Sequence, residues 1–369
     1  MKKIVGILSA AAVLATSVFA ADVSAKVNII GSLFNWQKDG NLKVLGIAEG
    51  GQSWNPSFQM AYADDRSGAS MKFYDNKGQD GQVSSVNYSL WFKPIEMLKF
   101  TVGNWATNLN QETIDYSNTE TGIDASGFAA SLDISGFTVD LFLVTGWSDS
   151  NFGWNRNGNI KPWLQKNADD DLRIGQTYLK LGYAADFGTI NGFFEYRPWN
   201  PAENSWSGPG IGIGEYNAFK FGVGYKNTIA DVTFFVNALG GITDSEFSNI
   251  RAEAFASTNI NGLGLAVFVP FDFALADNSG AFYTGDHFTK ALTKNTAVLG
   301  TSLKVTYGID AINLYCYVKE TNFLADKFSI EIKPGFTTNI GAASIDVAVD
   351  LYVQERFNVD VPVVFTLSF

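Results

Sequence analysis

The segment Phe357-Asn358-Val359-Asp360-Val361-Pro362-Val363-Val364-Phe365-Thr366-Leu367-Ser368-Phe369 decides the fold class. Every odd-numbered residue in it is aromatic or aliphatic, and the residues between are polar except Pro362 and Val364. A period of two is typical of a β-strand with one apolar and one mainly polar face. We therefore predict a strand over 357–369 that ends on an aromatic residue.

The same alternation recurs throughout the chain, in runs at 86–92, 219–225, 263–271, 328–336 and 345–353. With their flanks, these runs are about 9–13 residues long, close to the ~9–11 of a tilted membrane strand and longer than the ~5–6 typical of sandwich strands. After residue 20, no apolar run approaches the ~18 residues that a membrane-spanning helix needs. The chain is 46% hydrophobic and only 17% charged. Because its apolar residues are dispersed in these short alternating runs, we predict an all-β protein.

The connections between the runs alternate in length. Short ones rich in Asn, Asp and Gly, which supply the positive φ of tight hairpins, lie at 133–136, 185–188, 259–262, 308–311 and 339–342. Long polar stretches lie at about 107–126, 147–172, 198–217 and 273–296. Residues 91–100 look like one more short hairpin. Short turns at one end and long loops at the other are typical of an up-and-down barrel.

With its terminal aromatic residue, the segment 357–369 resembles the last strand of bacterial outer-membrane β-barrels of the porin-like type. The resemblance implies a transmembrane antiparallel up-and-down β-barrel, located in the cell outer membrane and surrounded by its lipid. It also implies that Phe365, Leu367 and Phe369 form an assembly signal for the barrel assembly machinery. Trimers are common among such barrels, so the resemblance extends to a homotrimer, although no subunit interface is apparent in the sequence.

The N-terminus has the pattern of a secretory signal peptide. Lys2 and Lys3 precede an apolar stretch from Ile4 to about Leu14, and small-residue cleavage spacing ends at Ala20. We expect residues 1–20 to be this peptide and residues 21–369 to form a single barrel domain. The net charge of −11 argues against a nucleic-acid partner.

Counting gives about 19 candidate strands, whereas single-chain bacterial barrels have even numbers. The mismatch arises at the start, where strands near 26–36 and 42–49 are either wrongly divided or not both in the barrel. We predict about 18 strands, with 16 as the alternative. A barrel of this size leaves a water-filled lumen rather than a packed interior.

Charged residues in the strands should face this lumen, because a lipid-facing Lys or Arg near the membrane midplane costs about 2–4 kcal/mol. The predicted pore-lining residues are Asp140, Lys180, Glu195, Arg197, Lys220, Arg251, Glu253, Lys304, Glu331, Lys333, Asp346, Asp350 and Asp360. Both signs of charge are present, which argues against a selectivity ring of one sign. The alternative for each residue is a solvated polar wall without a selective role.

Other motifs give weaker signals. The loop-side tryptophans suggest an aromatic girdle at the membrane surface or, alternatively, a stacking platform for solutes. Asp286-His287 could form a general base, but a solvated loop histidine is favoured. Asp169-Asp170-Asp171 lacks the spacing of a calcium loop. With one Cys and one His in the chain, we expect no metal site, no cofactor and no catalytic residues.

The sequence favours a porin-like channel for passive diffusion of small hydrophilic solutes, and not an enzyme. One alternative is a surface adhesin or antigen that uses the barrel as a scaffold for its long loops. Another is a secreted soluble all-β binding module. The residues do not identify the solute.

Overall fold

The structure is a computed structural model of the whole chain. It describes residues 24–37, 42–47, 57–74, 85–107, 109–110, 123–146, 163–166, 172–198, 217–243, 246–277, 293–320, 322–326, 329–353 and 357–368. The predicted signal peptide, residues 1–20, lies outside these residues.

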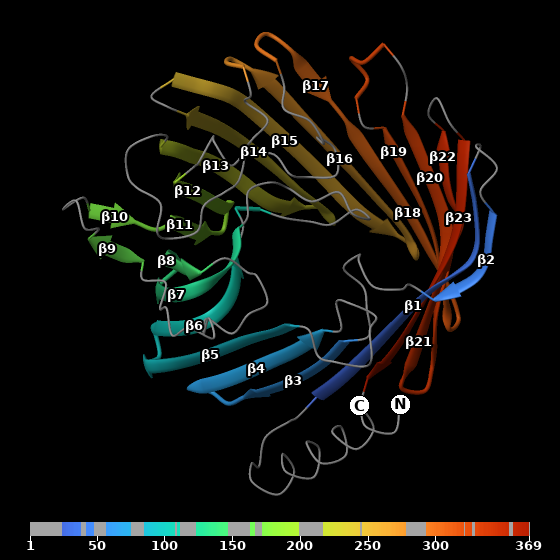
Figure 1. Ribbon diagram of the computed structural model, residues 1–369, viewed down its shortest axis with the longest axis horizontal. Coiled ribbons are helices and arrows are strands. Elements are labelled where there is room, and N and C mark those ends of the chain that lie inside the picture. Colours follow the sequence, from blue (N-terminus) through green and yellow to red (C-terminus); the bar gives the residue numbers. More distant parts are fainter. Residues whose placement is uncertain are drawn as a thin grey trace, which may run out of the picture.

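The main sheet is a closed ring of antiparallel strands (Figure 1). Strands occupy the ring in chain order, with β8 paired to β11, and β1 (Ser24–Gln37) pairs with β23 (Phe357–Ser368) to close the ring. The joint is long: it runs from Lys26 opposite Ser368 to Gln37 opposite Asn358, with one bulge between Ser32 and Phe34. The predicted C-terminal strand is therefore confirmed, and it is the strand that completes the barrel.

Within the described residues the ring contains 21 strands, which occupy 18 positions. Three positions are each shared by two successive strands. β2 and β3 both pair with β1, at 31–36 and 24–28 respectively. β17 and β18 both pair with β16, and β21 and β22 both lie between β20 and β23. The predicted number of 18 is confirmed. The surplus candidate near 42–49 is β2, the first half of the position that β3 completes.

The remaining strands of the ring are β2 (Leu42–Ile47), β3 (Ser57–Ala63), β4 (Ser67–Tyr74), β5 (Ser85–Ile95), β6 (Leu98–Thr107), β7 (Ile123–Ile134), β8 (Phe137–Gly146), β11 (Thr177–Ala185), β12 (Gly188–Pro198), β13 (Asn217–Ile229), β14 (Val232–Thr243), β15 (Glu246–Ile260), β16 (Leu263–Ala274), β17 (Ala297–Leu299), β18 (Thr301–Ile309), β19 (Ile312–Glu320), β20 (Ile330–Ile340), β21 (Ala343–Ala348) and β22 (Asp350–Val353). A separate two-stranded hairpin, β9 (Leu164–Lys166) with β10 (Leu172–Ile174), lies in the connection between β8 and β11.

The five predicted short turns and the hairpin at 91–100 all join successive strands of the ring. Positive φ occurs at these turns, for example at Gly136 (87°), Gly188 (123°) and Gly262 (86°). An L side chain is strained there and glycine is not. These residues therefore fix the turns and, with them, the register of the strands.

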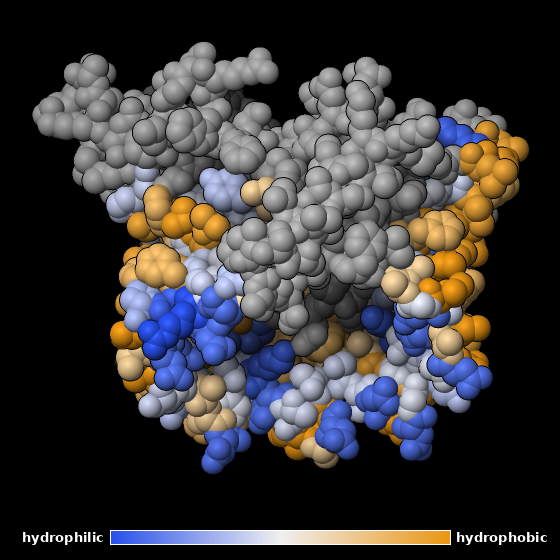
Figure 2. Space-filling view, turned by 90° about the horizontal axis from the view of Figure 1, so that it is seen from below, coloured by the Kyte–Doolittle hydropathy of each residue, from blue (hydrophilic) through white to orange (hydrophobic). Residues whose placement is uncertain are grey.

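The outer surface of the ring is apolar. Along β11–β15, side chains that point outward are largely exposed, such as Leu181 (51%), Val223 (54%) and Ile250 (50%). Hydrophobic side chains gather along both flanks of the face in Figure 2, and hydrophilic ones gather toward its lower edge. Alternation thus places one residue in two on the outer face, the arrangement expected of strands that span a membrane. No helix among the described residues is long and apolar enough to span a membrane.

Candidate functional site

The candidate site is the inner face of the ring. Directly opposed residues of antiparallel strands point to the same face. Asp140 stands opposite Lys180, and Glu195 stands opposite Lys220. Their chain neighbours Leu141 and Phe194 are exposed on the outer face, at 38% and 43%. The strand pairing therefore gathers these charges on the inside.

The predicted pore-lining residues fall into two groups by exposure. Those that are buried are Glu195, Lys220, Arg251, Glu253, Lys333 and Asp350. Those that are half-buried are Asp140, Lys180, Lys304, Glu331, Asp346 and Asp360. The backbone of Arg197 pairs with Ala218, and its side chain lies outside the described residues. Both groups occur on both sides of the ring: Lys333 and Asp350 are buried on β20 and β22, whereas Asp140 and Lys180 are half-buried on β8 and β11.

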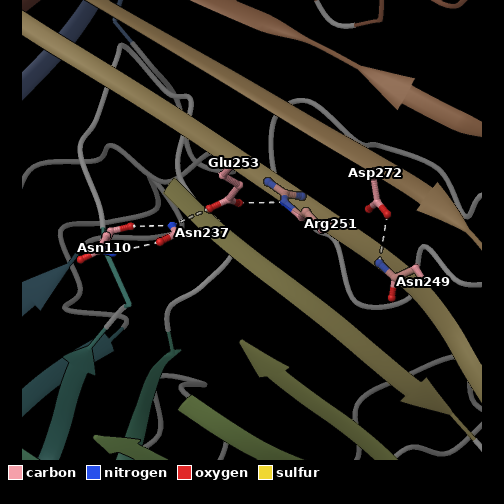
Figure 3. A network of polar contacts seen from close by, with 6 residues as sticks. All are labelled: Asn110, Asn237, Asn249, Arg251, Glu253 and Asp272. Atoms are coloured by element: carbon pink, nitrogen blue, oxygen red, sulfur yellow. Dashed lines mark hydrogen bonds and ion pairs between the residues drawn. The ribbon is translucent and has the colours of Figure 1, made fainter. Parts of the chain in front are cut away.

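A buried polar network runs along β14, β15 and β16 (Figure 3). Arg251 donates its Nε to Glu253 at 2.7 Å, and Asn237 donates to the same carboxylate at 3.0 Å. Asn237 in turn exchanges hydrogen bonds with Asn110, which comes from the connection after β6. In a setting of low dielectric, such charge-assisted bonds are strong and orient their partners.

Asp272 extends this wall by one strand. It stands directly opposite Arg251 and accepts a hydrogen bond from Asn249 at 3.0 Å. It is fully buried. Asp272, Asn249 and Asn237 are missing from the predicted pore-lining set. The sequence pattern could have identified them, because an Asp or Asn among apolar neighbours in a strand indicates the inner face as clearly as Lys or Arg does.

The inner face also carries aromatic side chains that the sequence analysis did not place there. Trp105, Phe142, Tyr178 and Phe193 belong to one buried cluster, in which the Tyr178 and Phe193 rings stack at 5.3 Å. Phe235, Phe255 and Phe268 form a second cluster. The expectation of an inner face lined by polar residues is wrong at these positions, because parts of the interior are packed.

The wall formed by β18–β23 carries more acidic than basic side chains among its predicted pore-lining residues. Tyr315 donates a hydrogen bond to Asp346, and Ser32 donates to Asp360 at 2.6 Å. Lys333 Nζ lies 3.8 Å from an Asp350 oxygen, and Asp350 stands directly opposite Asp360. Like charges in direct opposition repel, so the nearby cation and hydroxyl donors help to hold the pair in place.

One further cation lies on this wall. Lys304 Nζ lies 5.2 Å from the centre of the Tyr317 ring, within the range of a cation–π contact. An ammonium group above an aromatic face keeps its hydrogen atoms available to other partners. The wall therefore presents both signs of charge and an aromatic face.

The weaker motifs mostly escape a structural test. Asp286, His287 and the aspartates at 169–171 lie outside the described residues. Trp163 is described, and its Nε1 donates to the Thr177 hydroxyl at 3.0 Å. Cys316 is a free thiol on the outer row with Leu314 and Val318. No group of three or more His, Cys, Asp or Glu side chains in the described parts could hold a metal ion.

The predicted assembly signal lies at the closing seam. Phe365 stands opposite Ile29, and Leu367 opposite Val27, on β1. The Phe365 side chain is 49% exposed on the outer face. The Leu367 side chain and the whole of Phe369 lie outside the described residues, so recognition of this segment stays a prediction.

A closed antiparallel barrel with 18 strand positions, an apolar outside and charges inside defines a protein fold of the outer-membrane porin type. No family model matches the chain, and no curated protein does. Solved porin structures do match it. OccK11 (OpdR) of Pseudomonas aeruginosa aligns with a TM-score of 0.57 and 10% identity, over 95% of this chain and 96% of that one.

Two other solved structures match over similar shares of both chains. OpdQ of Pseudomonas aeruginosa gives a TM-score of 0.57 and 10% identity, over 95% of this chain and 99% of that one. A BenF-like porin from Pseudomonas fluorescens Pf-5 gives 0.52 and 10%, over 95% and 98%. At such identities the similarity shows the fold alone. The porin-type outer-membrane β-barrel predicted from the sequence is thereby confirmed as the fold of this chain.

Proposed function

We propose that the protein is an outer-membrane porin through which small hydrophilic solutes diffuse passively. The observation that carries this proposal is the ring of 18 strand positions whose outer face is apolar and whose inner face carries charges of both signs. Such a wall keeps water and polar solutes inside the barrel while the outside stays in lipid. Transport then depends on size and charge, and the protein is not an enzyme.

Two parts of the chain would serve export of the protein and assembly of the barrel. Residues 1–20 would direct export as a signal peptide and be removed. The C-terminal segment with Phe365, Leu367 and Phe369 would be recognised by the barrel assembly machinery. A homotrimer in the outer membrane is part of the same proposal and rests on the resemblance to porin-like barrels.

Within the lumen, we assign the solute path to the half-buried side chains of the wall β18–β23, including Lys304, Asp346 and Asp360. These side chains keep contact with solvent, whereas Glu195, Arg251 and Glu253 are at most 2% exposed and serve the wall itself. We propose that the half-buried members of the wall β18–β23 meet solutes and that the buried members of the set hold the barrel.

Planar-bilayer recording of the folded, purified protein tests the proposal. We expect stepwise ion conductance and a size cutoff for neutral solutes. Replacing both Asp346 and Asp360 by Asn should shift the reversal potential in a salt gradient toward anion preference. Replacing Lys304 by Gln should shift it the other way, since one removes negative and the other positive charge. A folded protein that never conducts would refute the channel.

One observation favours a second function. Leu109 and Asn110 lie inside the barrel against its wall, and a barrel closed from within would act as a scaffold for surface loops, as an adhesin or antigen does. The same recordings separate the two functions, because a scaffold does not conduct. The soluble alternative fits poorly with an outer face on which so many large apolar side chains are exposed.

A further inference from the structure

The hairpin of β5 and β6 places two lysines beside one indole ring. Lys99 Nζ lies 4.9 Å from the centre of the Trp91 ring, and Lys93 Nζ lies 5.9 Å from it. Both distances fall within the range of a cation–π contact. Two ammonium groups therefore converge on a single aromatic side chain.

This group of three residues faces the lumen. Lys99 stands opposite Ser131, and Ser131 stands opposite Asp140, which is a predicted pore-lining residue. Directly opposed residues of antiparallel strands point to the same face. Phe92, next to Trp91 in the chain, is 51% exposed on the outer face, so the alternation of the strand turns Trp91 inward.

A glycine gives the indole ring its place on the wall. Gly68 on β4 stands directly opposite Trp91. A Cβ atom at Gly68 would lie 2.3 Å from Trp91 Nε1 and 2.4 Å from Trp91 Cε2. The ring therefore occupies the space that a side chain at position 68 would need, and its position depends on this glycine.

The backbone around Lys93 fixes the position of this residue in the hairpin. The register between β5 and β6 is irregular from Phe92 to Ile95, and such irregularities re-aim side chains. The Lys93 backbone N–H also donates to the Arg66 carbonyl in the turn between β3 and β4, at 2.7 Å. Because this hairpin is one of the short connections of the ring, the group lies near the short-turn end of the lumen.

The described part of the chain does not neutralise the two lysines. Among the described residues, Lys93 and Lys99 form no ion pair within 4.0 Å. Two acidic residues lie beside them, Glu96 in the hairpin and Asp133 on β7, whose N–H donates to the Met97 carbonyl. Both acidic residues are exposed, and their charges are screened by water and salt. The two ammonium groups therefore remain available to an anion from the lumen.

The chemistry of the group fits a doubly charged oxyanion. Each ammonium has three hydrogen atoms to donate, and lysine binds phosphate as a point charge. A phosphate group carries about −1.5 to −2 charges at pH 7. It therefore balances both lysines, whereas a single carboxylate balances one.

We propose that Lys93, Lys99 and Trp91 form a binding site for phosphate groups, free or esterified, near the short-turn end of the lumen. The two lysines contact the anion, and Trp91 is a positioning residue that holds them together. The inference rests on the proposed channel function, because solutes reach the site through the lumen. A site in a transport path must also release its solute, so we expect a Kd of about 1 mM.

Protection of lysines from a water-soluble amine reagent tests the site. The folded protein is labelled in detergent in chloride, acetate, inorganic phosphate or glycerol phosphate at equal pH and ionic strength, and mass spectrometry gives the labelling rate of each lysine. With the expected Kd, about 10 mM of either phosphate should slow the labelling of Lys93 and Lys99 roughly tenfold. Lys304, which lies over the Tyr317 ring on another wall, is the internal control and should change less than about twofold.

Variants assign the protection to the named residues. Lys99→Gln should abolish the protection of Lys93, and Lys93→Gln should abolish that of Lys99, because one ammonium no longer balances the anion. Gly68→Ala should displace the indole ring and weaken the protection of both lysines. Gly308→Ala is the matched control, since nothing lies within 4 Å of its Cβ position, and it should behave as the native chain does. Lys93 and Lys99 are only half-buried, so their variants decide the result if Gly68→Ala fails to fold.

The four salts separate the outcomes. Protection by inorganic phosphate supports a site for the free ion, and protection by glycerol phosphate supports a site for the ester. Equal labelling rates in all four salts, equal protection by acetate, or protection that survives both lysine variants would overturn the site. So would a folded protein in which neither lysine can be labelled.

Labelling does not require conduction, so failure of the site and failure of the channel are distinguishable. A chain that conducts ions but shows no protection refutes the phosphate site and leaves the channel. A chain whose lysines are protected but which never conducts refutes the channel and leaves the site.

Discussion

The inner walls formed by β6–β16 and by β18–β23 are built from the same alternating strands, yet they differ in what covers them. On the first, the aromatic clusters and the Arg251–Glu253 pair are buried, with Tyr178 and Phe235 at 0% and Arg251 at 1% exposure, although Asp140 and Lys180 are half-buried. On the second, Lys304, Asp346 and Asp360 are half-buried, and Lys333 and Asp350 are buried. Strand alternation therefore decides which side chains point inward, but contacts across the lumen decide which of them can meet solvent.

The difference has a chemical consequence. On the first wall, the carboxylate of Glu253 is satisfied by an arginine and an asparagine. On the second, Asp350 and Asp360 face each other across one strand pair, and a lysine lies 3.8 Å from the first. The first arrangement is a hydrogen-bonded network, whereas the second sets two carboxylates against each other with one lysine nearby.

Removal of an aromatic ring should give the largest difference in unfolding free energy between the two walls. Phe235→Ala removes a ring with no exposure that stacks on Phe255 at 5.0 Å, and it should lower the free energy of unfolding by about 3–5 kcal/mol. Tyr317→Ala removes a half-buried ring and should cost about 1–2 kcal/mol. Urea unfolding in lipid vesicles measures both. Similar losses would show that the walls are packed alike.

Breaking an ion pair should give the next largest difference in unfolding free energy between the two walls. Glu253→Ala leaves the Arg251 guanidinium buried beside Asp272 without its carboxylate, which should cost about 3 kcal/mol. Asp350→Ala takes a partner from the buried Lys333, but this pair is longer, at 3.8 Å, and the change also relieves the repulsion on Asp360, so we expect a smaller loss of about 2 kcal/mol. The same unfolding assay compares the two variants. A larger loss of unfolding free energy for Asp350→Ala would show that the ion pair of the second wall stabilises the barrel more than that of the first.

The sequence predicts the strands, the short turns and the closing role of 357–369 well, because each follows from local periodicity and turn chemistry. It also predicts that charged strand residues point inward, because a charge in contact with lipid is unfavourable, but it misses Asp272. It does not predict the packed interior. In Phe193-Phe194 and Phe234-Phe235 both faces are aromatic, and alternation alone cannot tell a water-filled lumen from a packed one.

The inward position of Leu109 and Asn110 was beyond sequence reasoning for a related reason. The stretch 107–126 was expected to be an outer loop, and nothing in Leu109-Asn110 itself indicates that it turns inward. Its partners Asn191, Gly224 and Asn237 lie on three different strands. They come together only when the ring closes, so their common purpose depends on register and curvature rather than on spacing along the chain.

The turn between β3 and β4 supplies a carboxylate outside both walls, and its titration should have the smallest effect. Asp64 accepts hydrogen bonds from the Tyr62 hydroxyl at 2.6 Å, from the backbone of Arg66 and Ser67, and from the Ser67 hydroxyl. These bonds, led by that of Tyr62, lower the pKa of Asp64 from 3.8 to about 2. The folded state thus favours the charged form.

A lowered pKa in the folded state adds stability that is present above pH 4 and is lost as the pH falls toward 2. Asp64→Asn should remove this part of the acid dependence and leave stability between pH 6 and 8 little changed, since the turn is exposed. Thermal unfolding followed by gel migration from pH 6 to pH 2 measures it. If the variant and the native chain lose stability in parallel, the Asp64 carboxylate does not contribute to the acid response.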